Sequence, residues 1–191
     1  MKKILFVLLF VPLVSFGQVK IYKGLIEGMS KKEAKNVIKK NKNDYKVVAV
    51  GNGVEWTIRT TSPMYNPENY LVGVTMWPKG FLLTGTGYEI AVSYLETTKQ
   101  FFIDRNYSVI LESTYWNAPK NFNDGGFLYG CVLLSPDDER VIHIYPSETP
   151  SLDGKTYRDT AYAKVMTKSF WDKTQEARKE VKKEEIKDTD F

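Results

Sequence analysis

The feature that most constrains the fold of this chain is a pattern that occurs twice: a helix start, a stripe of apolar residues at helical spacing, and then strands joined by tight turns. Ser30 and Glu33 form a capping box, and Thr86 and Glu89 form a second one. In each box the hydroxyl and the carboxylate satisfy backbone N–H groups that the first turn of a helix leaves free. We therefore expect one helix to begin just after Ser30 and another just after Thr86.

Alternating apolar and polar residues predict the strands that follow each helix. The clearest turn is Asn52-Gly53, because both residue types accept the positive φ angles of a two-residue hairpin turn. Pro78-Lys79-Gly80 marks a second turn, and Asn106 can end the second helix in a left-handed conformation. The expected strands cover residues 46–50, 54–60, 71–77, 81–84, 107–116, 127–134, 140–145 and 161–167.

We interpret the chain as an α+β fold of two tandem units, each with one capped helix packed on a roughly four-stranded antiparallel sheet. The first unit spans residues 18–84 and the second spans residues 85–167. Residues 168–191 follow as a charged helical tail, which Phe170 and Trp171 anchor and which ends in disorder. One continuous α+β sheet is the alternative to two units.

Residues 1–17 have the features of a secretory signal peptide. Two lysines precede an apolar run at residues 4–14, and small residues stand before a cleavage site after Gly17. That run is too short to span a bilayer, which takes about 20 residues, and no later apolar run is longer. We expect a soluble mature protein, residues 18–191, in the periplasm or secreted from the cell, with no transmembrane segment.

Motifs for catalysis and metal binding are absent from the sequence. The chain has no Gly-x-Ser-x-Gly, no His-Glu-x-x-His, no Cys-x-x-Cys and no glycine-rich phosphate loop. Its single histidine, His143, alternates with apolar neighbours, which indicates a half-buried structural side chain. Its single cysteine, Cys131, cannot form an internal disulfide and is interpreted as a small buried hydrophobic residue. We expect no catalytic residue, no metal and no cofactor.

A carboxylate-dependent hydrolase of a cell-surface polymer is the enzymatic alternative, because a glycosidase needs only two acidic side chains. Glu112 lies in the middle of an expected strand and is the acidic residue whose position is least explained. Asp137, Asp138 and Glu139 follow Pro136 between two apolar runs, so turn chemistry accounts for them. A single unexplained carboxylate does not make a mechanism.

Basic residues gather near the start of the mature chain. Residues 18–50 carry nine lysines against Glu27, Glu33 and Asp44. In an exported protein nucleic acid is an unsuitable partner for such a patch, whereas an anionic lipid, an anionic glycan or an acidic protein face fits it. The candidate contacts are Lys31, Lys32, Lys35 and Lys39, and a solvated helix face is the alternative interpretation.

Aromatic residues lie close to the ends of several expected strands. Trp77, Tyr115 and Trp116 are the candidate contacts of a binding surface, and residues of the core are the alternative. Large rigid rings gain contact area at low entropic cost, whether on a sugar ring or on another protein.

Gly28-Met29-Ser30-Lys31-Lys32-Glu33-Ala34, followed by a short helix and a hairpin with Val54-Glu55-Trp56, resembles the opening of the small lipoprotein subunit of the outer-membrane β-barrel assembly machinery. The helix-plus-sheet unit used twice is similar to the β-lactamase inhibitor protein fold. The chain departs from the first by lacking the lipid-bearing cysteine, and from the second by lacking disulfides. Both resemblances imply a non-catalytic envelope protein that works through a concave sheet or exposed loops. We therefore expect a binding module whose partner is another envelope or secreted protein.

Overall fold

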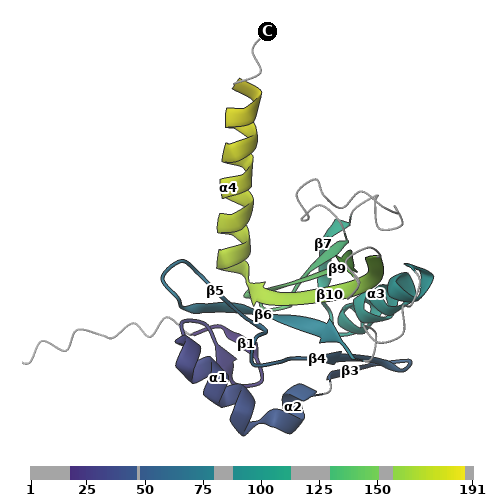
Figure 1. Ribbon diagram of the computed structural model, residues 1–191. Helices are drawn as coiled ribbons and strands as arrows, with labels where there is room; N and C mark the ends of the chain where they lie inside the picture. Colours follow the sequence, from purple (N-terminus) through teal and green to yellow (C-terminus); the bar gives the residue numbers. More distant parts are fainter. Residues whose placement is uncertain (1–17, 47, 80–87, 113–129, 151–156, 188–191) are drawn as a thin grey trace, which may run out of the picture.

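A computed structural model gives an α+β fold built around one large antiparallel sheet (Figure 1). The structure describes residues 18–46, 48–79, 88–112, 130–150 and 157–187. The strands of this sheet are β3 (Val48–Gly51), β4 (Val54–Thr57), β5 (Pro63–Tyr65), β6 (Leu71–Pro78), β7 (Ser108–Glu112), β8 (Cys131–Leu134), β9 (Arg140–Pro150) and β10 (Tyr157–Thr167). Their order is β3-β4-β6-β10-β9-β8-β7, and β5 also pairs with β6.

The other elements cover the two faces of the sheet unequally. They are a small hairpin, β1 (Lys20–Tyr22) and β2 (Leu25–Ile26), and the helices α1 (Lys31–Lys40), α2 (Lys42–Lys46), α3 (Tyr88–Ile103) and α4 (Lys168–Lys187). The hairpin and α1 to α3 contribute to the main hydrophobic core, whereas α4 rises from the opposite face and projects away from the sheet (Figure 1). None of the helices in the described residues combines the length and apolar character needed to cross a bilayer.

The expectation of two separate four-stranded units needs correction, because strands from both halves of the chain join in a single sheet. Strand β6 pairs with β10, so that Val74 lies opposite Val165 and Met76 opposite Ala163. The other edge of β6 pairs with β4 and β5. Most of β6 is buried, as is usual for a central strand covered on both faces. The continuous-sheet alternative is the arrangement that the structure has.

The helix start and the first hairpin turn predicted in the first half are confirmed, whereas the strands expected at 46–50 and 54–60 are β3 at Val48–Gly51 and β4 at Val54–Thr57, because Lys46 belongs to α2. Helix α1 begins at Lys31, and Ser30 and Glu33 form the capping box through hydrogen bonds in both directions. Asn52 and Gly53 join β3 to β4 with φ angles of 48° and 75°. Strand 81–84, Thr86 of the second box and the signal segment 1–17 lie outside the described residues, as do parts of the strands expected at 107–116 and 127–134.

The second helix also ends as predicted. Helix α3 stops at Ile103, and Asn106 takes the left-handed conformation with a φ angle of 62°. The backbone N–H of Asn106 donates to the carbonyl of Ile103 at 2.9 Å, and that of Tyr107 donates to Phe102 at 3.1 Å. These bonds satisfy carbonyl groups that the last turn of a helix leaves free. The chain can therefore turn directly into β7.

Trp56 joins the sheet to α3 at the centre of the main core. Its side chain is fully buried, and its indole Nε1 donates a hydrogen bond to Thr98 Oγ1 at 3.0 Å. The ring of Tyr94 packs edge-on against Trp56 with the centroids 5.2 Å apart, and the Tyr94 hydroxyl bonds to the backbone of Glu55. Cys131 is also fully buried, as expected of a small hydrophobic side chain.

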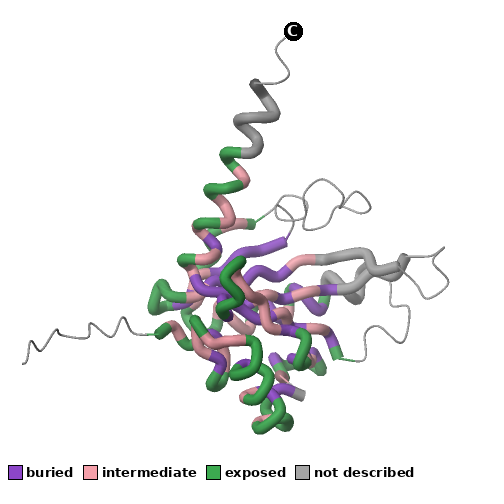
Figure 2. The backbone as a smooth tube through the Cα atoms, turned by 60° about the vertical axis from the view of Figure 1, so that its left-hand side comes forward, coloured by how far each residue is buried: buried purple, intermediate pink, exposed green. Residues whose placement is uncertain are grey.

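The first turn of helix α4 is anchored in a small apolar cluster. Trp171 is 6% exposed and packs with Val132, Val141 and Met166 on the face of the sheet opposite the main core. Phe170 lies beside this cluster. Beyond Trp171 the described side chains are exposed or partly exposed (Figure 2). The predicted anchoring of a charged helical tail by Phe170 and Trp171 is therefore confirmed.

Two glycine substitutions test how closely β8 and β9 approach each other. Gly53 and Gly130 both have positive φ angles, so that alanine is strained at either position. A Cβ on Gly53 meets nothing within 4 Å, whereas one on Gly130 overlaps the Ile144 carbonyl oxygen and lies 2.7 Å from the Tyr145 Cα. Gly53→Ala should lower the free energy of unfolding by about 1–2 kcal/mol, and Gly130→Ala by roughly 4 kcal/mol or more. Urea denaturation measures both values, and equal losses would contradict the close approach.

Candidate functional site

A row of aromatic side chains crosses three strands on the face of the sheet opposite the main core. Trp77 comes from β6, Tyr162 from β10, and Tyr145 and His143 from β9; these four residues are called the aromatic row. The ring centroids of Trp77 and Tyr162 are 4.9 Å apart and tilted by 75°, and those of Tyr162 and Tyr145 are 5.6 Å apart and nearly parallel at 25°. Because side chains alternate along a strand, the register that sets Tyr162 opposite Tyr145 places both on one face.

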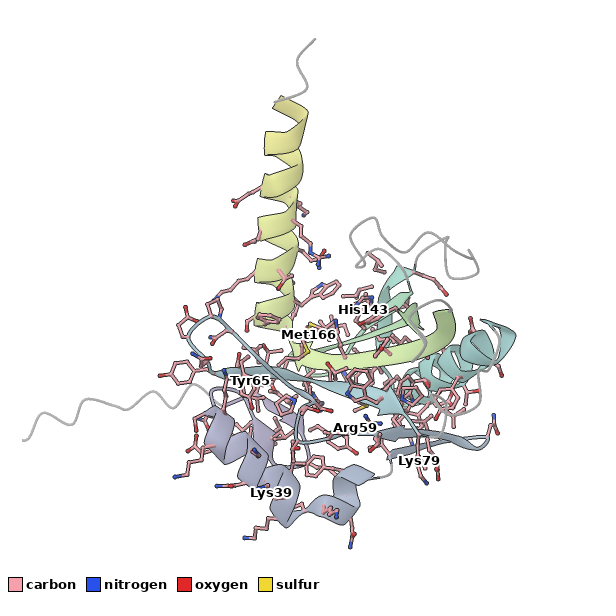
Figure 3. The ribbon with its side chains drawn as sticks, viewed as in Figure 1. Lys39, Arg59, Tyr65, Lys79, His143 and Met166 are labelled. Carbon is pink, nitrogen blue, oxygen red and sulfur yellow. The ribbon has the colours of Figure 1, made fainter. Side chains whose placement is uncertain are left out.

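The two ends of the aromatic row differ in exposure. His143 is 1% exposed, and its ring lies 4.6 Å from Tyr145 and 5.6 Å from Trp171 at the foot of α4. Figure 3 shows His143 and Met166 close to that foot. Trp77, Tyr162 and Tyr145 are only partly buried. The structural role expected of His143 agrees with this position, although the side chain is fully rather than half buried.

Cationic groups accompany the partly buried rings. The Arg59 guanidinium lies 5.7 Å from the centre of the Trp77 ring, and Lys164 Nζ lies 5.1 Å from that of Tyr145. Burial lowers the pKa of Lys164, and the nearby charge of Arg178 lowers it further. Burial also raises the pKa of Tyr145 to about 12. Tyr145 and Lys164 therefore sit in a poorly hydrated part of the row, where electrostatic contacts are stronger than in open water.

Trp77 carries a polar group that a ligand can use. Its indole Nε1 is buried and has no hydrogen-bond partner in the described part of the chain. A buried donor without an acceptor costs about 1–3 kcal/mol. Because this nitrogen is enclosed, an acceptor on a bound molecule recovers that energy when the Trp77 side chain turns to expose it. The site thus offers flat apolar surface, cationic groups and one directed donor, a combination suited to binding rather than to bond cleavage.

The sequence-predicted aromatic residues are only partly located by the structure. Trp77 belongs to the aromatic row, whereas Tyr115 and Trp116 lie outside the described residues. Sequence reasoning missed Tyr145 and Tyr162, which are each in an expected strand but meet only across the β9–β10 pairing. The period-two alternation in both strands was the available signal. This alternation assigns each tyrosine to one face of its own strand. It could not show that the two strands pair and bring both tyrosines to the same face of the sheet.

The predicted lysine patch forms one exposed surface of α1, on the side of the molecule away from α4 (Figure 1). Ala34 and Ile38 are its buried residues, and Lys31, Lys32, Lys35 and Lys39 are all exposed. Figure 3 shows Lys39 on this outer side. The one acidic residue of α1, Glu33, is used in the capping box, and hydrogen bonds from Ser30 lower its pKa. The outer surface of α1 is therefore strongly basic.

Glu112 lies on β7, and its carboxylate is exposed and paired with Lys99. Burial acts to lower the pKa of Lys99, but the hydrogen bond and the charge of Glu112 outweigh it and raise that pKa. The buried thiol of Cys131 has its pKa raised to about 12 by desolvation. No group of three or more His, Cys, Asp or Glu residues suited to a metal ion occurs among the described residues. Glu112 is thus an ion-paired side chain on an exposed strand.

The acidic run at Asp137 forms a turn, as its residue types predict. The Asp137 carboxylate accepts hydrogen bonds from the Ser135 hydroxyl and, at 3.0 Å, from Arg140 Nη2. Burial tends to raise the pKa of Asp137, but these hydrogen bonds together lower it. Asp138 has a positive φ angle of 56°, which suits the turn between β8 and β9.

The pH dependence of stability tests the buried state of Tyr145. Its pKa rises from 10.0 to about 12, so the unfolded chain loses the phenolic proton at a lower pH than the native protein does. The free energy of unfolding should therefore fall as the pH rises through that window, by up to about 1.4 kcal/mol per pH unit. In Tyr145→Phe the decline should be shallower, while near neutral pH the slopes of the two proteins should agree. Urea denaturation at a series of alkaline pH values measures both slopes, and parallel curves would show that Tyr145 is not buried as described.

Comparison of this chain with family models, with curated proteins and with solved structures finds no match. The resemblance carried by residues 28–60 therefore receives no support from known proteins. What the chain can bind follows from its own surfaces, of which the aromatic row has the most specific geometry.

Proposed function

We propose that the protein is an exported, non-catalytic binding module of the bacterial cell envelope, and that the aromatic row is its contact surface. The partner that we infer is another envelope or secreted protein. The single observation that carries this proposal is the partly buried end of the row, where Trp77 holds a buried Nε1 without a partner among the described residues. Trp and Tyr are the residues that most often dominate the energetics of protein interfaces.

The rigidity of the row supports the same proposal. Trp77, Tyr162 and Tyr145 come from neighbouring strands of one sheet, and each ring is held by contact with the next. Rings that are already fixed lose little conformational entropy when a partner binds, so more of the contact energy appears as affinity. The resemblance of the Gly28–Ala34 segment to an envelope lipoprotein points in the same direction.

Replacement of Trp77 tests this function. The tagged mature chain, residues 18–191, is purified from the envelope fraction of its own cell, and proteins that co-elute are identified by mass spectrometry. Trp77→Ala should weaken the affinity of a stoichiometric partner by at least about 30-fold, which is the loss typical of an interface hot spot. Tyr70→Ala is the matched control, because Tyr70 is 52% exposed and lies outside the aromatic row; it should retain the partner.

Three results would count against this proposal. Retention of the partner by Trp77→Ala, or its loss in Tyr70→Ala alone, would move the interface away from the row. Specific binding of a glycan in place of any protein would replace the inferred partner. Circular dichroism and urea denaturation of each variant separate lost binding from lost folding, since removal of a partly buried tryptophan should cost roughly 1–3 kcal/mol.

Peripheral binding to an anionic surface is a second candidate function, favoured by the exposed lysines of α1. Lys31, Lys35 and Lys39 are exposed and follow one another at a spacing of four residues along the helix, and Lys31 Nζ stands 5.5 Å from the centre of the Tyr65 ring. Lysine and tyrosine side chains together suit the interface between lipid headgroups and water. This surface is separate from the aromatic row, so both functions can coexist in one chain.

Vesicle binding at two salt concentrations tests the second candidate. Lys35→Gln combined with Lys39→Gln should weaken binding to anionic vesicles by about 2 kcal/mol, or roughly 30-fold, because each lysine near such a surface contributes about 1 kcal/mol. Lys173→Gln combined with Lys179→Gln removes the same charge from exposed positions on α4 and should have little effect. Binding of the unmodified protein should also fall steeply with salt. Retention that ignores salt, or equal losses in the two variants, would argue against an α1 contact.

A further inference from the structure

A cavity of about 350 Å³ lies on the core side of the sheet, where β1, β3 and α3 meet. Its floor is formed by Met76, Ile142 and Val165 from three strands of the sheet, and Phe101 and Phe102 of α3 form one wall. Close-packed interiors contain few voids larger than a water molecule. A space of this size falls instead within the range of small-molecule sites, which is about 300–1,000 Å³.

One directed polar group, Arg140, stands at the lining of this cavity. Arg140 begins β9 and shares the core face of that strand with Ile142 and Ile144, because side chains alternate along a strand. Its Nη2 donates to Asp137 at 3.0 Å, which holds the guanidinium in place. Its Nε is buried and has no hydrogen-bond partner within the described ranges of the chain. Because Nε is enclosed, Arg140 brings to the cavity the positive charge of a fixed guanidinium rather than this donor.

The deeper polar group of the wall is already satisfied. Thr98 Oγ1 accepts a hydrogen bond from Trp56 Nε1 and donates one to the carbonyl of Tyr94 at 2.8 Å. Tyr22, Lys23 and Tyr107 add polar groups to other parts of the lining. A buried water needs two to four polar partners, and the floor and the wall formed by Phe101 and Phe102 provide none. An occupant that suits this cavity combines an apolar body with one acceptor group for Arg140.

We propose that the cavity binds a medium-chain carboxylic acid, with the carboxylate at the Arg140 guanidinium and the hydrocarbon chain between the sheet and Phe101 of α3. The apolar chain fills space that no side chain of the described residues fills, and the carboxylate pairs with the charge of the guanidinium. This site lies on the opposite face of the sheet from the aromatic row. It does not depend on the proposed function, and either can hold without the other.

Isothermal titration of the mature chain with dodecanoate, below its micelle concentration, tests the proposal. We expect one molecule to bind per chain, and dodecanol of equal chain length to bind about ten- to hundredfold more weakly because it has no charge for Arg140. Arg140→Met should weaken dodecanoate by a similar factor and leave dodecanol unchanged. Arg59→Met is the matched control, since Arg59 lies over Trp77 outside the cavity, and it should bind dodecanoate normally.

A second variant keeps the test independent of the Arg140–Asp137 pair. Val48 lines the cavity from β3 and is only partly buried, so Val48→Phe adds bulk inside the space without touching Arg140. It should abolish binding of both ligands while the protein remains folded by circular dichroism. Absence of dodecanoate binding in the unmodified chain, or equal affinities for dodecanoate and dodecanol, would overturn the proposal. Normal dodecanoate binding by folded Val48→Phe would also overturn it, whereas Trp77→Ala should bind as the unmodified chain does.

Discussion

The pairing of β6 with β10 is the interaction on which the rest of this structure depends. It sets Val74 opposite Val165 and Met76 opposite Ala163, and it joins the strands of the first half of the chain to those of the second. Side chains alternate along each strand, so this register also decides which residues enter the core and which reach the other face. A slip of one residue would bury Trp77 and Tyr162 and expose the apolar residues that now hold the helices.

The two faces of the sheet have different surroundings as a result. The core face is covered by α1, α2, α3 and the β1–β2 hairpin, and at its centre Trp56 is tied to α3 by a hydrogen bond to Thr98. The cavity beside Arg140 lies in this layer, where β1, β3 and α3 meet over the same strands. On the other face Trp171 and Phe170 at the start of α4 pack on the sheet, and further along the helix the charge of Arg178 reaches Lys164. The aromatic row extends from that cluster toward Trp77, which leaves its far end partly exposed.

Features that depend on a few neighbouring residues could be predicted from the sequence. The capping box of Ser30 and Glu33, the turn at Asn52-Gly53 and the left-handed Asn106 all appear where their residue types indicate. The strands that pair with β6 could not be predicted in the same way. The alternation of apolar and polar residues shows which face of the sheet a side chain occupies, but it does not show which strands lie next to each other. The sequence does carry a signal for a central strand, since the run from Leu71 to Val74 is apolar on both faces and is buried throughout.

The candidate site could be predicted only in part, because only some of its residues carry a local signal in the sequence. Trp77 could be singled out as a large ring at a strand end, whereas Tyr145 and Tyr162 join it only through pairings between strands distant in sequence. Arg140 gave no signal at all, because a surface arginine and one beside a cavity look alike in sequence.

The sequence by itself determined the α+β class, the helix start at Lys31, the turn at Asn52-Gly53 and the burial of Cys131, since short segments specify local hydrogen bonding and hydrophobic periodicity. Only the tertiary structure decided that both halves share one sheet, that four aromatic rings form a row, and that a cavity lies beside Arg140. Those features need contacts between residues far apart in the chain, and such contacts follow from strand order and register rather than from any single segment.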